Sequence, residues 1–357
     1  CAELKNCYEL FLPIARVRGR GFGMDPAPWG ASRGRGGLLG FDADRLEAAN
    51  VAAVELVAAL RAKWEAPKTT IVLNGAIGPR GDGYKAGRME AGEAEDYHAF
   101  QVEIFAGTQA DMVSAITMNT VNEAVGIARA AKAADMPCVV SYTVETDGRL
   151  ADGTTLRAAI EATEEATGAS PAYYMVNCAH PSHFEQALAR DEAWVKRIHG
   201  VRANASAKSH AELDESDTLD IGDIGDLSRR YRGLTRAFPS MRILGGGCGT
   251  DHPHIPAICE AVSPAAPAAL AKPQPTRDET ADGRAPSAGE IFDVSLRTGR
   301  HDLGHHTRSQ GGSPSGRTCI PPHAARPRRI QRPLPARHRL RTRADSPSAP
   351  PSDADVT

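Results

Sequence analysis

The feature that most constrains the fold is a repeated alternation of short β-rich runs and helical patterns between residues 20 and 262. Seven such pairs follow one another at intervals of roughly 25 to 50 residues, which suits the length of a β-α-β step. The expected strands are 21–24, 70–73, 112–118, 138–144, 173–176, 201–205 and 241–244, and the expected helices are 42–64, 93–107, 121–134, 155–167, 183–198, 224–238 and 255–262. Strict alternation of this kind predicts a parallel sheet covered by helices.

Two closures of a parallel sheet compete, an open doubly wound sheet and a (β/α)8 barrel. No G-x-G-x-x-G turn joins a strand to a helix, so the dinucleotide-binding form of the open sheet has no support. The most polar and glycine-rich segments all follow strand ends, at 75–84, 145–153, 177–183 and 245–254. Because a barrel builds its site from many strand ends, we expect an α/β fold of the (β/α)8 TIM-barrel type.

The first strand of such a barrel is absent from the pattern. A helical segment at 8–15 precedes the first expected strand, so the chain begins inside the first helix. A ring of seven strands has an open seam with two unpaired edges. We expect either that the gene is truncated at its N-terminal end or that residues 1–20 or a partner chain cover this seam.

Composition divides the chain near residue 263. Residues 263–357 hold 14 of the 25 prolines and 15 basic residues against nine acidic ones, and their one aromatic residue is Phe292. So few large apolar side chains do not offset the entropy of ordering. We therefore expect a barrel over 1–262 and a disordered Pro/Arg-rich tail over 263–357. The basic tail allows contact with nucleic acid or anionic lipid, and a solvated linker is the plainer interpretation.

Charge and hydropathy narrow the possible partners of the whole chain. The net charge is -2, which gives nucleic acid no support as a general partner. No apolar run reaches the ~18 residues of a membrane span, and the N-terminal residues lack the pattern of a signal peptide. Seven scattered cysteines favour reduced thiols over a disulfide framework. We expect a cytoplasmic protein without a membrane partner; its oligomeric state is left open.

Two cysteines follow strand ends, where a barrel holds catalytic metals. Cys178 follows the strand 173–176, and Cys248 lies in the glycine-rich loop after the strand 241–244. Thiolates are soft ligands that suit Zn²⁺, and a catalytic zinc commonly has three protein ligands and one open position. A buried, inert thiol is the alternative for both, and it is our interpretation of Cys138 and Cys259.

The segments 175–180 (MVNCAH) and 242–252 (RILGGGCGTDH) closely resemble the two metal-binding segments of the homocysteine S-methyltransferase family. The segments 78–84 and 141–148 resemble the same family in the same order, so the resemblance covers about residues 8–262. It implies a (β/α)8 barrel with a zinc cofactor held by three thiolates, of which Cys178 and Cys248 would be two. It also implies transfer of a methyl group from a sulfonium, ammonium or folate donor to the zinc-bound thiolate of homocysteine, which gives methionine.

The resemblance also assigns residues to the substrate. Glu145 would pair with the ammonium group of homocysteine, and Asn177 would orient the ligand loop at the substrate site. Without the resemblance, Glu145 is a solvated loop carboxylate and Asn177 a turn former. No general base is expected, because a metal-bound thiol is already held as thiolate.

Gly247 departs from the family pattern, in which the glycine-rich motif ends in two adjacent cysteines. Glycine has no ligand atom, so the third thiolate is missing, with His180, Asp251 or His252 as candidates to replace it. The Gly247→Cys substitution is accordingly predicted to raise zinc affinity. Two alternatives to the methyltransferase follow: a relative that has lost zinc binding and activity, and a binding protein that acts through its basic tail.

Overall fold

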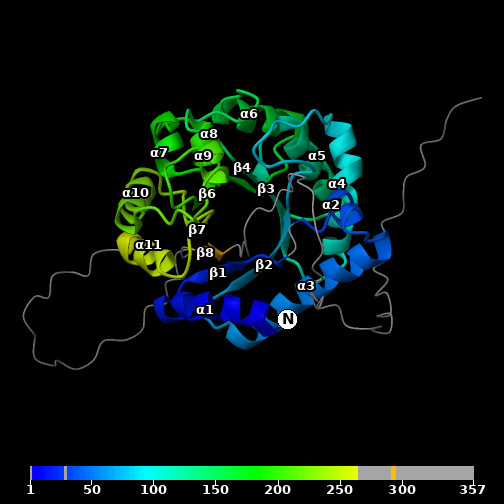
Figure 1. Cartoon of the computed structure of the whole chain (residues 1–357), viewed down its shortest axis with the longest axis horizontal. Helices are drawn as coiled ribbons and strands as arrows, with labels where there is room; N and C mark the ends of the chain where they lie inside the picture. The colour runs from blue at the N-terminus through cyan, green and yellow to red at the C-terminus, as the bar shows by residue number, and fades with distance from the viewer. Residues whose placement is uncertain (1, 28–29, 264–290, 295–357) are drawn as a thin grey trace, which may run out of the picture. The chain divides into compact units, whose positions relative to one another are not determined.

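The computed structural model describes residues 2–27, 30–263 and 291–294, whose strands form a closed ring with helices around it (Figure 1). In ring order the strands are β1 (Gly21–Met24), β2 (Ile71–Ile77), β3 (Met112–Met118), β4 (Cys138–Tyr142), β5 (Tyr173–Asn177), β6 (Ile198–Ala203), β7 (Ile243–Gly246) and β8 (Ile291–Val294). Every neighbouring pair is parallel. The predicted α/β barrel is therefore confirmed.

The eighth strand comes from the segment that composition assigned to a disordered tail. β8 pairs with β1 on one side and with β7 on the other, so it closes the seam that the sequence left open. Of the two alternatives for the seam, cover by residues 1–20 or a partner chain is wrong, because β8 occupies this place, and the disorder expected at 291–294 is wrong as well. Ile, Phe and Val are good strand formers, and averaging over the whole tail hid this short run. The rest of the tail prediction, beyond Ser263, lies outside the described residues.

The helices follow the predicted order. They are α1 (Ala2–Arg18), α2 (Arg33–Leu38), α3 (Ala43–Trp64), α4 (Ala91–Ala106), α5 (Val121–Ala133), α6 (Leu156–Thr167), α7 (Pro181–Phe184), α8 (Ala193–Lys196), α9 (His210–Asp214), α10 (Ile224–Ala237) and α11 (His254–Val262). Asp42 caps α3 as predicted, since its carboxylate accepts a hydrogen bond of 2.8 Å from the Arg45 backbone N–H. Within the described residues, none of these helices has the length and apolar composition of a membrane span.

One predicted helix, 183–198, is not continuous. The structure has α7, a 3-10 turn at Glu185–Ala187, an irregular stretch and α8, and β6 already begins at Ile198. Glu192, just before α8, accepts hydrogen bonds from the Trp194 indole and from Arg157 of α6. The bond from Arg157 is a tertiary contact, so local apolar spacing does not reveal this break in the helix.

A buried polar network crosses the interior of the barrel. Arg202 of β6 pairs with Asp25, which follows β1, at 2.5 Å, and each side chain is 2% exposed. Asp25 also accepts a hydrogen bond of 2.6 Å from Asn74 of β2, whose carbonyl oxygen accepts one of 2.8 Å from Ser114 of β3. Because buried charges are costly unless they are paired and hydrogen-bonded, this network ties four strands of the ring together.

Candidate functional site

The two candidate ligand cysteines lie at the carboxyl ends of strands that are separated in the ring only by β6. Cys178 directly follows β5 and is 1% exposed, whereas Cys248 follows β7 by two residues and is partly exposed. The carboxyl end of the strands is where barrel enzymes carry their sites.

Asn204, the first residue after β6, links the two cysteine segments. Its Nδ2 donates a hydrogen bond of 3.0 Å to the Cys178 carbonyl, and its Oδ1 accepts one of 2.8 Å from the Cys248 N–H. The side chain is 2% exposed, so water competes little for either bond. Asn204 was not predicted as a site residue, because it lay within the expected strand 201–205 and an asparagine in a strand has many ordinary roles.

A second path of contacts joins the two cysteines through Tyr84 and His210. His210, at the start of α9, donates from Nε2 to the Cys178 carbonyl at 2.6 Å, and its Nδ1 lies 3.0 Å from Glu145 Oε1. The Tyr84 ring packs against that of His210 with centroids 4.0 Å apart and the planes tilted by 31°, and the Tyr84 hydroxyl lies 3.5 Å from Cys248 Sγ. Glu145, with a side chain 33% exposed, therefore belongs to the same cluster as both cysteines.

Asn119, which follows β3, holds the loop that contains Tyr84. Asn119 Nδ2 donates hydrogen bonds of 3.0 Å to the carbonyls of Asp82 and Lys85, on either side of Tyr84. The Asp82 carboxylate in turn accepts a bond of 2.9 Å from the Tyr84 N–H. Tyr84 is thus placed by a braced loop. Neither Tyr84 nor Asn119 stood out as a site residue in the sequence.

Asn177, the last residue of β5, is 1% exposed and uses its whole amide within the protein. Its Oδ1 accepts from the Thr117 N–H at 3.0 Å and from Ser141 Oγ at 2.6 Å. Its Nδ2 donates to Thr117 Oγ1 at 2.8 Å and to Cys178 Sγ at 3.1 Å. The two hydrogens and two lone pairs of the amide are all engaged. A contact between Asn177 and a substrate stays a prediction.

Gly247 lies where a side chain has no space. A Cβ at this position would be 2.7 Å from Asn204 Oδ1 and 2.8 Å from the Arg202 carbonyl. The Gly247 N–H donates a hydrogen bond of 2.7 Å to the Ala203 carbonyl, which keeps the loop close to β6. A cysteine at position 247 would therefore need movement of Asn204 or of the β6 backbone.

The three candidates for the missing ligand have other partners. Asp251 and His252 are exposed, with Asp251 Oδ1 accepting from the His252 N–H and the His252 ring 5.9 Å from that of Phe11. His180 caps α7, where its Nδ1 accepts from the Ser182 N–H at 3.4 Å. Among the residues that the structure describes, no three His, Cys, Asp or Glu side chains form a cluster that would hold a metal ion.

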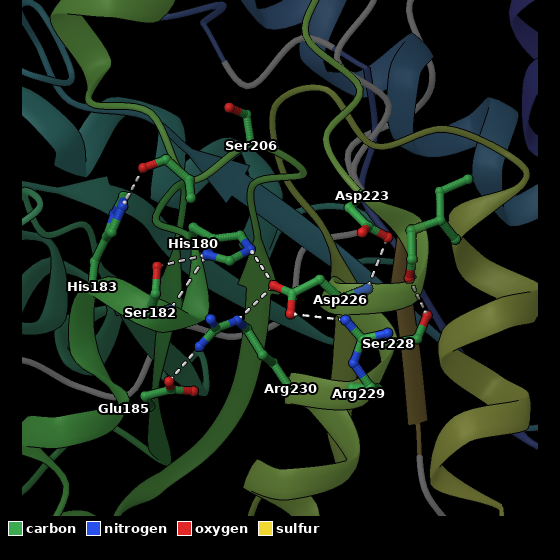
Figure 2. Close-up of polar contacts among 12 residues, drawn as sticks. His180, Ser182, His183, Glu185, Ser206, Asp223, Asp226, Ser228, Arg229 and Arg230 are labelled. Carbon is green, nitrogen blue, oxygen red and sulfur yellow. Dashed lines mark hydrogen bonds and ion pairs between the residues drawn. The ribbon is translucent and has the colours of Figure 1, made fainter.

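Figure 2 shows His180 facing Asp226 of α10, with its Nε2 3.9 Å from Asp226 Oδ2. The two line a cleft with other polar residues, among them Ser206, Lys208, Glu212, Asp220 and Asp223. Asp226 also pairs with Arg230 at 2.7 Å, and Arg230 pairs with Glu185. Burial, with a smaller contribution from Arg230, lowers the pKa of His180 to about 4, so its ring is neutral at pH 7. Of the four carboxylates that line the cleft, Asp226 pairs with arginines of its own helix and Asp220 pairs with Lys208.

Comparison with known proteins matches residues 27–262 to the family model described as homocysteine S-methyltransferase. The chain is similar in fold to crystal structures of the homocysteine methyltransferase MmuM from Escherichia coli. For the metallated form the TM-score is 0.53 and the identity 17%, over 70% of this chain and 83% of that one. For the oxidized form the values are 0.54 and 18%, over 70% and 82%. No curated protein sequence matches the chain.

Proposed function

The chain belongs to the homocysteine S-methyltransferase family, and we propose that it methylates the sulfur of homocysteine at the strand ends that carry Cys178 and Cys248. The observation that supports this site is the convergence of both cysteine segments on Asn204 and on the Tyr84–His210 pair. Methionine would be the product. The second substrate would be a small methyl donor of the sulfonium, ammonium or folate type.

In this proposal Cys178 and Cys248 hold a zinc ion. The two thiols fit zinc in kind, because thiolates are ligands that it prefers, and both have neighbours suited to orient them. They are one short of the usual three, because Gly247 has no side chain. When bound, zinc would keep the substrate thiol in its thiolate form at neutral pH.

The surrounding side chains would orient the reactants. Asn204 fixes the backbone of both cysteine segments. One carboxylate oxygen of Glu145 contacts His210, and the side chain is partly exposed. The carboxylate would therefore be available to pair with the ammonium group of homocysteine. Asn177 would act on the ligand loop through its contact with Cys178.

Methionine formation tests the proposal. The full chain would be supplied with zinc, homocysteine and one donor of each class, S-methylmethionine, betaine and methyltetrahydrofolate, with the product quantified by mass spectrometry. We expect methionine from at least one donor. Loss of Cys178 or Cys248 to serine should lower the rate by more than about 100-fold, since even outer-shell changes at metal sites cost 10–100-fold.

Cys7→Ser is the matched control, because Cys7 is a partly exposed thiol on α1, far along the chain from both ligands. It should leave the rate unchanged. Equal rates in the Cys178→Ser and Cys7→Ser proteins would contradict the assigned role. No methionine from any donor would favour the second candidate, a relative that has lost the reaction, for which Gly247 is the supporting observation.

A further inference from the structure

We infer that Thr117 and Asn177 are positioning residues that direct two hydrogen bonds onto the sulfur of Cys178. Asn177 Nδ2 lies 3.1 Å and Thr117 Oγ1 3.8 Å from Cys178 Sγ, and all three residues are 1% exposed. The catalytic consequence rests on the proposed function, whereas the geometry rests on these contacts alone.

The orientation of the Asn177 amide follows from its neighbours. The Thr117 backbone N–H is only a donor, and it lies 3.0 Å from the atom assigned as Asn177 Oδ1. If the amide were reversed, the Asn177 NH2 group would face the Thr117 backbone N–H, and neither of these two donors would have an acceptor. The NH2 end must therefore face Thr117 Oγ1 and Cys178 Sγ, where it donates one hydrogen to each.

The direction of the Thr117 hydroxyl depends on the charge state of Cys178. Thr117 Oγ1 accepts a hydrogen from Asn177 Nδ2 and lies 3.8 Å from Cys178 Sγ, and while the sulfur is a thiol either of these two groups can donate to the other. A thiolate, which is acceptor only, would receive both bonds.

The backbone is distorted where this arrangement requires it. On β3 two residues, Ile116 and Thr117, face the single residue Ser141 of β4, which is a β-bulge. Thr117 has φ 63°, a left-handed conformation that β-branched residues rarely adopt. Cys178 has φ 55°, and its carbonyl is held by Asn204 and His210. Both distorted residues face the same amide.

These bonds would orient Cys178 Sγ and withdraw electron density from it. Hydrogen bonds to a ligand atom set its direction and tune what it donates to a metal. In a site with two thiolates, the direction of each sulfur matters more, because no third ligand fixes the geometry.

The geometry is testable in the metal-free protein. The chain has seven asparagines, so selective ¹⁵N-asparagine labelling gives few side-chain signals, and Asn177→Asp identifies that of Asn177. Cys178→Ala should shift this signal and speed the exchange of its hydrogen roughly fivefold, the loss expected for one hydrogen bond. Cys248→Ala should leave it unchanged. An Asn177 signal that is the same in the Cys178→Ala protein and the parent would overturn the inference.

The effect on a bound metal is testable with Co²⁺, whose sulfur-to-cobalt charge-transfer band reports the energy of the sulfur lone pairs. Thr117→Val removes one donor to sulfur and should move the band to longer wavelength. Thr117→Ser keeps the hydroxyl and should not. Ser141→Ala removes a bond to the same amide, on its oxygen, and should not move the band either. Equal band shifts in the Thr117→Val and Ser141→Ala proteins would indicate a general loss of packing around the Asn177 amide. That result would contradict a specific hydrogen bond from Thr117 to the sulfur of Cys178.

The two experiments separate the inference from the proposed function. If the parent chain binds no Co²⁺, the zinc site of the proposed function fails, and the asparagine signal alone decides the hydrogen bond. If Thr117→Val does not fold, as judged by circular dichroism, the Cys178→Ala comparison still decides it.

Discussion

Gly247→Ala should destabilise the protein, because the glycine is a packing requirement of the loop after β7. An added Cβ would sit 2.7 Å from Asn204 Oδ1 and 2.8 Å from the Arg202 carbonyl, where ordinary contacts begin at 3.4 Å. Overpacking of this kind costs ~1–3 kcal/mol, and displacing Asn204 would also break its bond from the Cys248 N–H, worth ~0.5–1.5 kcal/mol. Replacing glycine also lowers the conformational entropy of the unfolded chain, which stabilises the native protein by ~0.4–1 kcal/mol. The net expectation is a free energy of unfolding lower by about 1–3 kcal/mol.

Urea unfolding followed by circular dichroism measures this change in the metal-free protein. Gly233→Ala on α10 is the control, because a Cβ there meets nothing within 4 Å and should be neutral or stabilising. Gly247→Cys should lose as much stability as Gly247→Ala before metal is added, whatever its zinc affinity. A Gly247→Ala protein as stable as the parent would refute the packing argument.

Three further predictions concern the scaffold. Between pH 6.5 and 4, His180 is protonated in the unfolded chain but neutral in the native protein. The free energy of unfolding should therefore fall on acidification, by ~2 kcal/mol at pH 5. Urea titrations of the His180→Asn protein should not show this loss. Arg202→Met leaves Asp25 buried without this partner and should cost ~3–5 kcal/mol, partly recovered on adding Asp25→Asn. A chain ending at Ser263 lacks β8, so its unpaired edges should produce larger species in size-exclusion chromatography, unlike a chain ending at Gly312.

Local patterns were enough to predict most of the barrel. Six helices, α3 to α6, α10 and α11, begin and end within two residues of the predicted positions, because their apolar spacing matches the face that they bury. The closing strand and the break between α7 and α8 were missed for a common reason. Both depend on pairing or packing with residues far along the chain, which no local window contains.

The candidate site was predictable only where one residue type indicates its chemistry. Cysteines after strand ends suggested a metal site, and Glu145 was placed at the same end of the barrel. Asn204, Tyr84 and Thr117 were missed, because an asparagine, a tyrosine or a threonine in a loop or strand has many ordinary roles. Their importance comes from contacts between separate strand ends, such as that of Tyr84 with Cys248.

The proposed binding of one zinc ion by Cys178 and Cys248 is tested most directly by zinc X-ray absorption spectroscopy, which counts the sulfur neighbours of the metal. The zinc-loaded full chain should show two sulfur atoms at ~2.3 Å, and three after homocysteine is added. Cys178→Ser or Cys248→Ser should each remove one. A zinc ion with no sulfur neighbours, or a sulfur count that homocysteine does not change, would contradict the account.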